Sequence, residues 1–289
     1  MTDLDILVTG ASGQLGALTI AALKRRAPEA RIGALVRRKE AAAELEAQGV
    51  EVRVASYDDP EALQAAFVGV DRLLLISSSE VGQRARQHAN VIDAARASGV
   101  GAILYTSLLR ATDSPLTVLP EEHVATERAL AASGLHHVIL RNGWYSENHA
   151  GAAAQAVGRG AIIGAAGEGR IHSAAREDFA EAAAAVLAGD LPASGTIHEL
   201  AGDTGYTMPE LAAEVSRLTG REVSYADMTQ EDYAAALTGA GLPAPVAAML
   251  ADSDAGAARG GLASGDRTLS RLIGRPTTPW QETLRRTLG

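Results

Sequence analysis

Three glycines near the N-terminus are spaced as a phosphate-binding loop requires. The segment TGASGQLG places Gly10, Gly13 and Gly16 after an apolar stretch and before a helical one. Glycine lets the backbone approach a pyrophosphate, and the free N–H groups at a helix N-terminus then stabilise its charge. Because strand, glycines and helix follow in this order, the segment predicts a dinucleotide-binding loop rather than a plain glycine-rich turn.

Basic residues end the second apolar stretch, where an NAD enzyme would place an acid to bind the adenosine ribose. The sequence there is Val36-Arg37-Arg38-Lys39, and Arg37 comes 21 residues after Gly16. A guanidinium can donate two parallel hydrogen bonds to a 2′-phosphate and can stack on adenine. The cluster therefore favours NADP(H) over NAD(H), the alternative being a solvated basic surface.

Polar residues follow two further apolar stretches. Ser77, Ser78 and Ser79 come after RLLLI, and Tyr105-Thr106-Ser107 ends AILYTS. Cofactors lie at the carboxyl ends of strands in open α/β sheets. The three serines therefore either bind ribose or phosphate, or cap the helix that follows.

The usual proton relay for reducing a ketone, Tyr-x-x-x-Lys, is missing. Lysine occurs only at Lys24 and Lys39, so no tyrosine has a lysine four residues on. Quinone reduction tolerates this loss better, because hydride addition yields an aromatic phenolate rather than an unstabilised alkoxide. His123 and Glu127 lie one helical turn apart, and His123 either orients substrate and relays a proton or is structural.

An aromatic segment, RNGWYSEN, follows the sixth apolar stretch and contains Asn142, Gly143, Trp144 and Tyr145. A flat nicotinamide and a flat acceptor both suit an aromatic wall with an amide hydrogen bond. The alternative is a hydrophobic plug joining the two halves of the chain.

Two arginines farther on, Arg170 and Arg176, are candidates for phosphate contact. Their alternative role is in salt bridges with Glu177 and Asp178.

The elements that must position these residues alternate between apolar runs and helical stretches. Most of the runs are continuously apolar, as in a parallel sheet covered on both faces. The expected strands are Asp5–Thr9, Arg31–Val36, Glu51–Val54, Arg72–Ile76, Ala102–Thr106 and His137–Leu140. Repeated strand and helix predict an α/β fold, a Rossmann doubly wound parallel sheet.

The chain changes character after Asn148, where glycine becomes frequent in GRGAIIGAAGEG. We expect a helix near Glu177–Leu187, a strand near Thr196–Leu200, and a helix that begins at Thr207 with Pro209 in its first turn. These elements predict a smaller C-terminal α/β lobe. The expected division is an NADP-binding domain at 1–146 and about 175–203, and a substrate lobe at about 147–174 and 204–289.

Composition excludes several chemistries. The 289 residues contain no cysteine, which rules out disulfides, thiolate nucleophiles, zinc ribbons and iron–sulfur clusters. A net charge of −9 argues against nucleic acid or an anionic membrane as partner. The start, MTDLD, carries acid where a secretory signal carries base, and no apolar run approaches the roughly 20 residues of a membrane span, so we expect a cytoplasmic protein. No His and carboxylate set has metal-ligand spacing, so no metal is expected. No flavin is expected either, because the loop of Gly10 to Gly16 already accounts for a hydride donor.

Together these motifs resemble the NmrA-like family of atypical short-chain dehydrogenases, and within it the bacterial, zinc-free NAD(P)H:quinone oxidoreductases of type 2. The similarity runs nearly end to end. Its segments are TGASGQLG, LLLISSSEVGQR, YTSLL, RNGWYSEN, LADSDAGAARGGL and LIGRPTT.

The resemblance implies NADPH-dependent, two-electron hydride transfer to a small quinone, with substrate between the nicotinamide and the C-terminal lobe. The implied cofactor contacts are Gly10, Ser12, Gly13, Gln14, Leu15, Gly16, Arg37, Ser77, Ser78, Ser79, Asn142, Gly143, Trp144, Tyr145, Ser146, Glu147 and Arg170. Asn142, Tyr145 and His123 are the candidate catalytic residues. The competing interpretation is an NADP(H)-binding sensor without catalysis, and both monomer and homodimer stay open.

Overall fold

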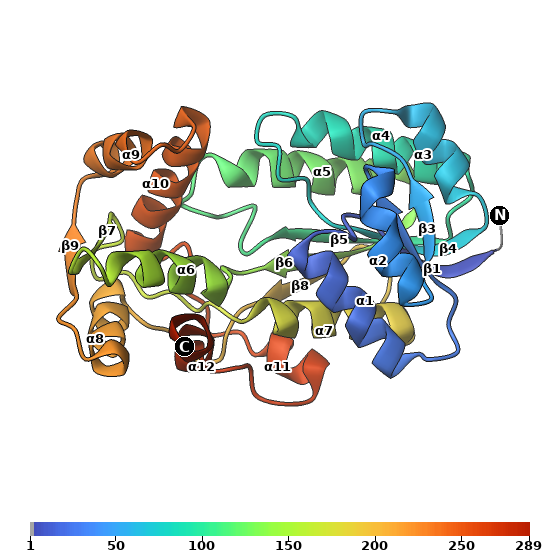
Figure 1. Cartoon of the computed structure of the whole chain (residues 1–289). Helices are drawn as coiled ribbons and strands as arrows, with labels where there is room; N and C mark the ends of the chain where they lie inside the picture. Colours follow the sequence, from blue (N-terminus) through green and yellow to red (C-terminus); the bar gives the residue numbers. More distant parts are fainter. Residues whose placement is uncertain (1–2) are drawn as a thin grey trace. The chain divides into compact units, whose positions relative to one another are not determined.

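A seven-stranded, mostly parallel sheet organises the first part of the chain in the computed structural model, which describes residues 3–289 (Figure 1). The first two residues of the MTDLD segment lie outside the described residues. The strands are β1 (Leu4–Val8), β2 (Ile32–Val36), β3 (Glu51–Val54), β4 (Val70–Leu75), β5 (Ala102–Leu108), β6 (His136–Asn142) and β8 (Thr196–Leu200). Their order, β3-β2-β1-β4-β5-β6-β8, confirms the predicted Rossmann fold.

The strand order reverses at β1, which pairs in parallel with β2 on one side and β4 on the other. In open sheets of this kind, ligands bind outside the carboxyl ends of the strands at such a switch point. The associated helices are α1 (Gln14–Arg26), α2 (Ala42–Ala47), α3 (Pro60–Phe67), α4 (Arg84–Ala97), α5 (Leu119–Ser133) and α7 (Arg176–Ala188), with a 3₁₀ turn at Lys39–Ala41.

The sheet forms the core because its central strands are apolar on both faces. All residues of β2 and β5 are buried, and Leu7, Leu73 and Leu104 have no exposed surface. Side chains of this kind each contribute about 1.5–3 kcal/mol when fully buried. The continuous apolar runs in the sequence are therefore the physical cause of this sheet.

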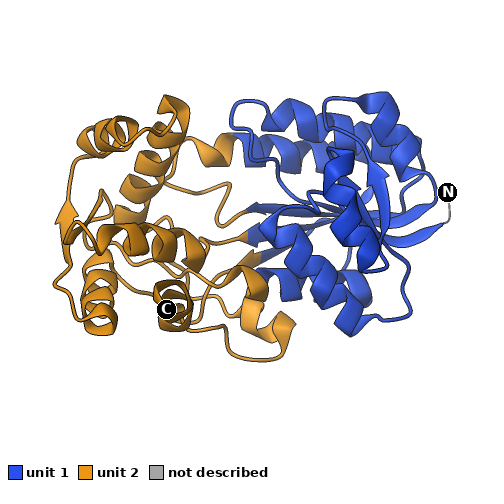
Figure 2. Cartoon of the chain, viewed as in Figure 1, with its two compact units in different colours: residues 1–107, 122–141, 179–198 blue, residues 108–121, 142–178, 199–289 orange. Residues whose placement is uncertain are grey.

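The chain divides into two compact units (Figure 2). Unit 1 holds the chain up to Ser107 together with 122–141 and 179–198, and unit 2 holds 108–121, 142–178 and 199–289. The functional division expected from the sequence stays a prediction, because compactness alone does not say which residues hold cofactor or substrate.

Unit 2 contains a two-stranded parallel sheet of β7 (Ala161–Gly164) and β9 (Ser224–Asp227). Its helices are α6 (Ser146–Ala156), α8 (Met208–Thr219), α9 (Gln230–Gly239), α10 (Ala244–Ala258), α11 (Thr268–Ile273) and α12 (Trp280–Leu288). Thr207 caps α8, as its sequence predicted, and also forms a capping box with Glu210. The small sheet was not predicted, because β7 lies in a glycine-rich stretch and β9 is mostly exposed.

No helix within residues 3–289 is both long enough and apolar enough to cross a membrane.

Candidate functional site

The glycine loop of unit 1 joins β1 to α1 with almost no room for side chains. Gly10 has φ +59°, and Gly13 is the N-cap of α1, its N–H donating to Gly10 O at 2.9 Å. A Cβ on Gly16 would lie 2.4 Å from Gly10 O. The first turn of α1 carries no acidic residue, and the first N–H groups of a helix have no partner within it, so this end of α1 suits an anion such as a pyrophosphate.

A hydroxyl network that the sequence did not reveal supports this loop. Ile76 N–H donates to Thr9 Oγ1 at 3.0 Å, and the Tyr57 hydroxyl bonds both Thr9 Oγ1 and Ile76 O. Thr9 is fully buried, and burial raises the pKa of Tyr57. The network ties the end of β1 to the segment after β4. A polar residue ending an otherwise apolar strand was the only sequence signal for it.

The basic cluster lies directly after β2. Arg37 forms an ion pair with Glu80, with Nη1 and Oε1 2.5 Å apart, and its side chain is 63% exposed. Arg38 and Lys39 have no ion-pair partner in the part of the chain that the structure describes. The cluster therefore keeps positive charge available for an anion such as a 2′-phosphate.

The three serines after β4 do not cap a helix, so that alternative is wrong. α4 begins at Arg84 with Gln83 at its N-cap. Ser78 instead donates its hydroxyl to Gln87 Oε1, and its N–H donates to Nε2 of His88. These bonds fix the shape of the segment 77–79, whose binding of ribose or phosphate stays a prediction.

His88 is neutral and holds one tautomer. Because Nε2 accepts from Ser78, the ring proton lies on Nδ1 and is donated to Thr126 Oγ1 at 2.9 Å. Burial, helped by the charge of Arg84, lowers the pKa of His88 to about 3. A fixed neutral ring of this kind positions the Ser78 backbone over the whole physiological pH range.

His123 and Glu127 are both buried in unit 1. His123 Nδ1 lies 2.7 Å from the Tyr105 hydroxyl, and burial together with the charge of Arg84 holds its pKa well below the usual range. Glu127 accepts two hydrogen bonds from Arg141, at 2.9 and 2.7 Å. The geometry thus favours the structural alternative for this pair. A substrate-orienting role for His123 stays a prediction.

The aromatic segment of unit 2 carries two buried polar atoms that lack a hydrogen-bond partner among residues 3–289. They are Asn142 Oδ1 and Trp144 Nε1. Since buried polar groups are normally satisfied, such atoms point to a ligand, which a purely apolar plug would not explain. An amide N–H of a nicotinamide suits the acceptor, and a carbonyl oxygen suits the donor, so these residues fit the expected cofactor and acceptor.

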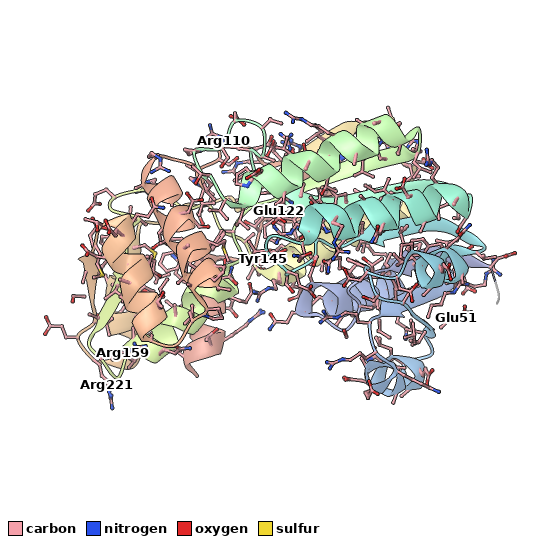
Figure 3. The ribbon with its side chains drawn as sticks, turned by 90° about the horizontal axis from the view of Figure 1, so that it is seen from above. Glu51, Arg110, Glu122, Tyr145, Arg159 and Arg221 are labelled. Carbon is pink, nitrogen blue, oxygen red and sulfur yellow. The ribbon has the colours of Figure 1, made fainter. Side chains whose placement is uncertain are left out.

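Two side chains, those of Asn142 and Arg176, contact Tyr145, which is labelled in Figure 3. Its hydroxyl is hydrogen-bonded to the Asn142 side chain, and because Asn142 Oδ1 is unpaired, the amide nitrogen donates. The Arg176 guanidinium lies 4.7 Å from the ring centroid. Burial raises the pKa of Tyr145, although the Asn142 bond and the Arg176 charge oppose it. Its hydroxyl therefore stays protonated and is a weak acid.

The remaining residues of the segment are occupied within unit 2. Gly143 N–H donates to Leu200 O at 2.7 Å, and Ser146 Oγ lies 2.8 Å from Ser173 Oγ. Glu147 accepts from the N–H of Arg176. These bonds fix the backbone that presents Asn142, Trp144 and Tyr145.

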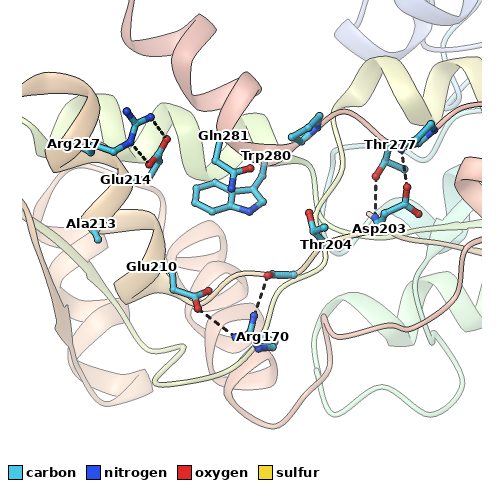
Figure 4. A pocket seen from close by; sticks show the side chains of 13 residues that line it. Arg170, Asp203, Thr204, Glu210, Ala213, Glu214, Arg217, Thr277, Trp280 and Gln281 are labelled. Carbon is cyan, nitrogen blue, oxygen red and sulfur yellow. Dashed lines mark hydrogen bonds and ion pairs between the residues drawn. The ribbon is translucent and has the colours of Figure 1, made fainter.

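Arg170 lines a hollow of about 710 Å³ in unit 2 (Figure 4). Its guanidinium donates to Gly205 O at 3.0 Å and pairs with Glu210 at 3.3 Å. Glu214 and Arg217, also in this hollow, pair with each other at 2.6 Å. Both arginines of the hollow are therefore ion-paired, and the cofactor contact of Arg170 stays a prediction.

The predicted salt bridges of Arg176 are wrong. Arg176 pairs with Glu147 and donates to Asn148, whereas Asp178 pairs with Arg275 at 2.7 Å. Arg176 begins α7, and residues one and two positions further along a helix point to other faces.

A parallel sheet whose order reverses at β1, with a glycine loop at that point and polar residues after the neighbouring strands, defines a dinucleotide-binding protein of the Rossmann class. The chain belongs to the NmrA-like family, whose model matches residues 2–257.

Individual relatives match nearly the whole chain. This chain is 52% identical over 279 residues to quinone oxidoreductase 2 of Escherichia coli strain K12, and the match covers 96% of this chain and 97% of that protein. The structure is similar to that of an Escherichia coli NADPH-dependent quinone oxidoreductase complexed with NADPH, with TM-score 0.94 and 51% identity over 98% of this chain and all of that one. Triphenylmethane reductase of Citrobacter sp., complexed with NADP(H), gives TM-score 0.92 and 36% identity, covering 98% of this chain and 100% of that chain.

Proposed function

We propose that this chain is an NADPH-dependent quinone oxidoreductase that passes a hydride directly to a small quinone, in one two-electron step. The observation that carries the proposal is the 52% identity, over 96% of this chain, to a quinone oxidoreductase. The buried unpaired atoms of Asn142 and Trp144 support it, because they suit a planar carboxamide or a quinone carbonyl.

The residues that would hold NADPH lie in several separate segments of the chain. The glycine loop binds the pyrophosphate, Arg37 with Arg38 and Lys39 binds the 2′-phosphate, and Ser77 to Ser79 bind ribose or phosphate. The other proposed contacts are Asn142, Gly143, Trp144, Tyr145, Ser146, Glu147 and Arg170. We assign the NADP-binding domain to 1–146 and about 175–203, and the substrate lobe to the rest.

The chemistry requires little acid from the protein. NADPH, when bound, supplies the hydride. Asn142 and Trp144 orient the reacting rings, and the ring of Tyr145 forms part of the wall beside them. The hydroquinone anion that forms is aromatic, so it takes its proton from water afterwards. The raised pKa of Tyr145 and the lowered pKa of His123 agree with the absence of a dedicated strong acid.

A single mixing experiment separates this proposal from a sensor that binds NADP(H) without catalysis. Purified protein, NADPH and a soluble quinone are combined, and absorbance is followed at 340 nm. We expect NADPH to be consumed in proportion to protein concentration. A protein that binds NADPH tightly but consumes none with any of several quinones would be a sensor.

Arg37→Ala should weaken NADPH binding about tenfold or more and leave NADH nearly unchanged, because one charge-assisted hydrogen bond contributes about 1.5–3 kcal/mol. Equilibrium titration of both cofactors measures this. Arg96→Ala is the matched control, since Arg96 is equally exposed and also ion-paired. Equal losses for both cofactors in Arg37→Ala would defeat the assignment.

Activity should need neither a metal nor a flavin. Within residues 3–289 no cluster of three His, Asp or Glu side chains could hold a metal ion. We expect colourless protein that keeps its activity in chelator. A yellow preparation that loses activity when its flavin is removed would refute this prediction.

We further propose that the protein acts in the cytoplasm on small molecules, without nucleic-acid or membrane partners. The net charge of −9 supports this, because it repels polyanions. A homodimer is compatible with the proposal, and sedimentation would decide it.

A further inference from the structure

Glu80 lies beside the guanidinium that the proposed function assigns to the 2′-phosphate. Arg37 follows β2 and Glu80 follows β4, the two strands that flank β1. The atoms Arg37 Nη1 and Glu80 Oε1 are 2.5 Å apart. This ion pair therefore spans the carboxyl end of β1, where the glycine loop begins.

The carboxylate of Glu80 is fixed by further bonds. Its second oxygen, Oε2, accepts from Gln87 Nε2 at 2.9 Å, and Gln87 is only 2% exposed. The N–H of Glu80 donates to Ser78 Oγ at 3.2 Å. Because both carboxylate oxygens and the backbone are engaged, Glu80 presents a positioned negative charge rather than a freely moving side chain.

That negative charge opposes a phosphate at the same place. Arg37, Arg38 and Lys39 carry three positive charges, and Glu80 offsets one of them. A guanidinium has five N–H donors, so Arg37 can hold Glu80 and still bind a phosphate. The phosphate then shares its cation with a carboxylate, which weakens the attraction. The 2′-hydroxyl of NADH carries no charge and is not affected in this way.

We propose that Glu80 is a specificity-determining residue: it restrains the attraction of Arg37 for the 2′-phosphate and so narrows the preference for NADPH over NADH. The inference rests on the proposed function, because it requires a dinucleotide at the glycine loop. In this proposal Arg37, after β2, strengthens the binding of NADPH, and Glu80, after β4, weakens it.

The test is the isosteric change Glu80→Gln, whose amide oxygen can still accept from Gln87. We expect NADPH to bind about threefold to fivefold more tightly, the upper part of the range that an exposed ion pair covers, while NADH changes by less than about twofold. The fragment 2′,5′-ADP, which carries the 2′-phosphate, should also bind more tightly. The affinity for 5′-AMP, which lacks this phosphate, should not change. The gain should shrink at high salt, because exposed charges are screened.

Asp93→Asn is the matched control. It removes one negative charge and an exposed ion pair with Arg96, also on α4, and should leave the ratio of NADPH to NADH affinity unchanged.

Two results of Glu80→Gln would overturn the inference: weaker NADPH binding, which would mean that Glu80 orients Arg37 productively, or no change in the affinity ratio. Both are distinct from failure of the proposed function, which would show as wild-type protein that binds neither cofactor or consumes no NADPH with quinone.

Discussion

Asn142→Ala should lower kcat about 100-fold, because the nicotinamide loses the acceptor that positions it and a displacement of about 1 Å can cost that much. Asn142 is 5% exposed, its amide nitrogen donates to the Tyr145 hydroxyl, and its Oδ1 has no partner in residues 3–289. Alanine removes the unpaired acceptor and also releases Tyr145. Steady-state rates with saturating NADPH measure the loss, and thermal melting checks that the variant is folded.

Tyr145→Phe is the control for that prediction. It keeps the ring that lies under Arg176 and removes only the hydroxyl. If the mechanism needs no strong acid, this variant should keep most of the turnover. Loss of all turnover in Tyr145→Phe, with Asn142→Ala silent, would make the tyrosine the acid and the mechanism wrong.

Gly16→Ala should weaken NADPH binding at least roughly tenfold, since small displacements in a positioned site are costly. The new Cβ would lie 2.4 Å from Gly10 O and 2.7 Å from Ala11 Cα. Both are backbone atoms, so α1 must move away from the end of β1. We expect a stability loss of about 1–3 kcal/mol from this overpacking. Titration with NADPH and chemical unfolding measure the two effects.

Gly151→Ala is the matched control, because Gly151 lies within α6 and its Cβ would meet nothing within 4 Å. Alanine there should stabilise the protein by about 0.5–1 kcal/mol. If Gly16→Ala behaves like Gly151→Ala and binds NADPH normally, the loop does not hold the pyrophosphate.

The sheet could be predicted because its information is local. All the strands of the large sheet were predicted, most of them from continuous apolar runs, with boundaries wrong by at most two residues, as at β5, which extends to Leu108. The glycine loop could be predicted for the same reason, since Gly10, Gly13 and Gly16 act within one turn. The strands β7 and β9 were not predicted, because neither has a sequence pattern that distinguishes it from a loop.

The charge pairs could not be predicted, because each depends on tertiary structure. Arg37 meets Glu80, 43 residues away, only because β2 and β4 flank β1. Arg176 was expected to pair with its chain neighbours but contacts Glu147 instead. Sequence spacing shows which residue types are available, whereas the partner of a long arginine side chain is decided by the fold.

The most direct test of hydride transfer is an anaerobic comparison of NADPH with NADPH carrying deuterium at the transferred position of C4. The protein is mixed with cofactor and quinone, and the rate at 340 nm and the amount of hydroquinone are recorded together. The account predicts one hydroquinone per NADPH consumed, no reduced protein-bound flavin, and a slower rate with the deuterated cofactor when transfer limits turnover. Semiquinone accumulating in place of hydroquinone, or bound NADPH that no quinone oxidises, would contradict it.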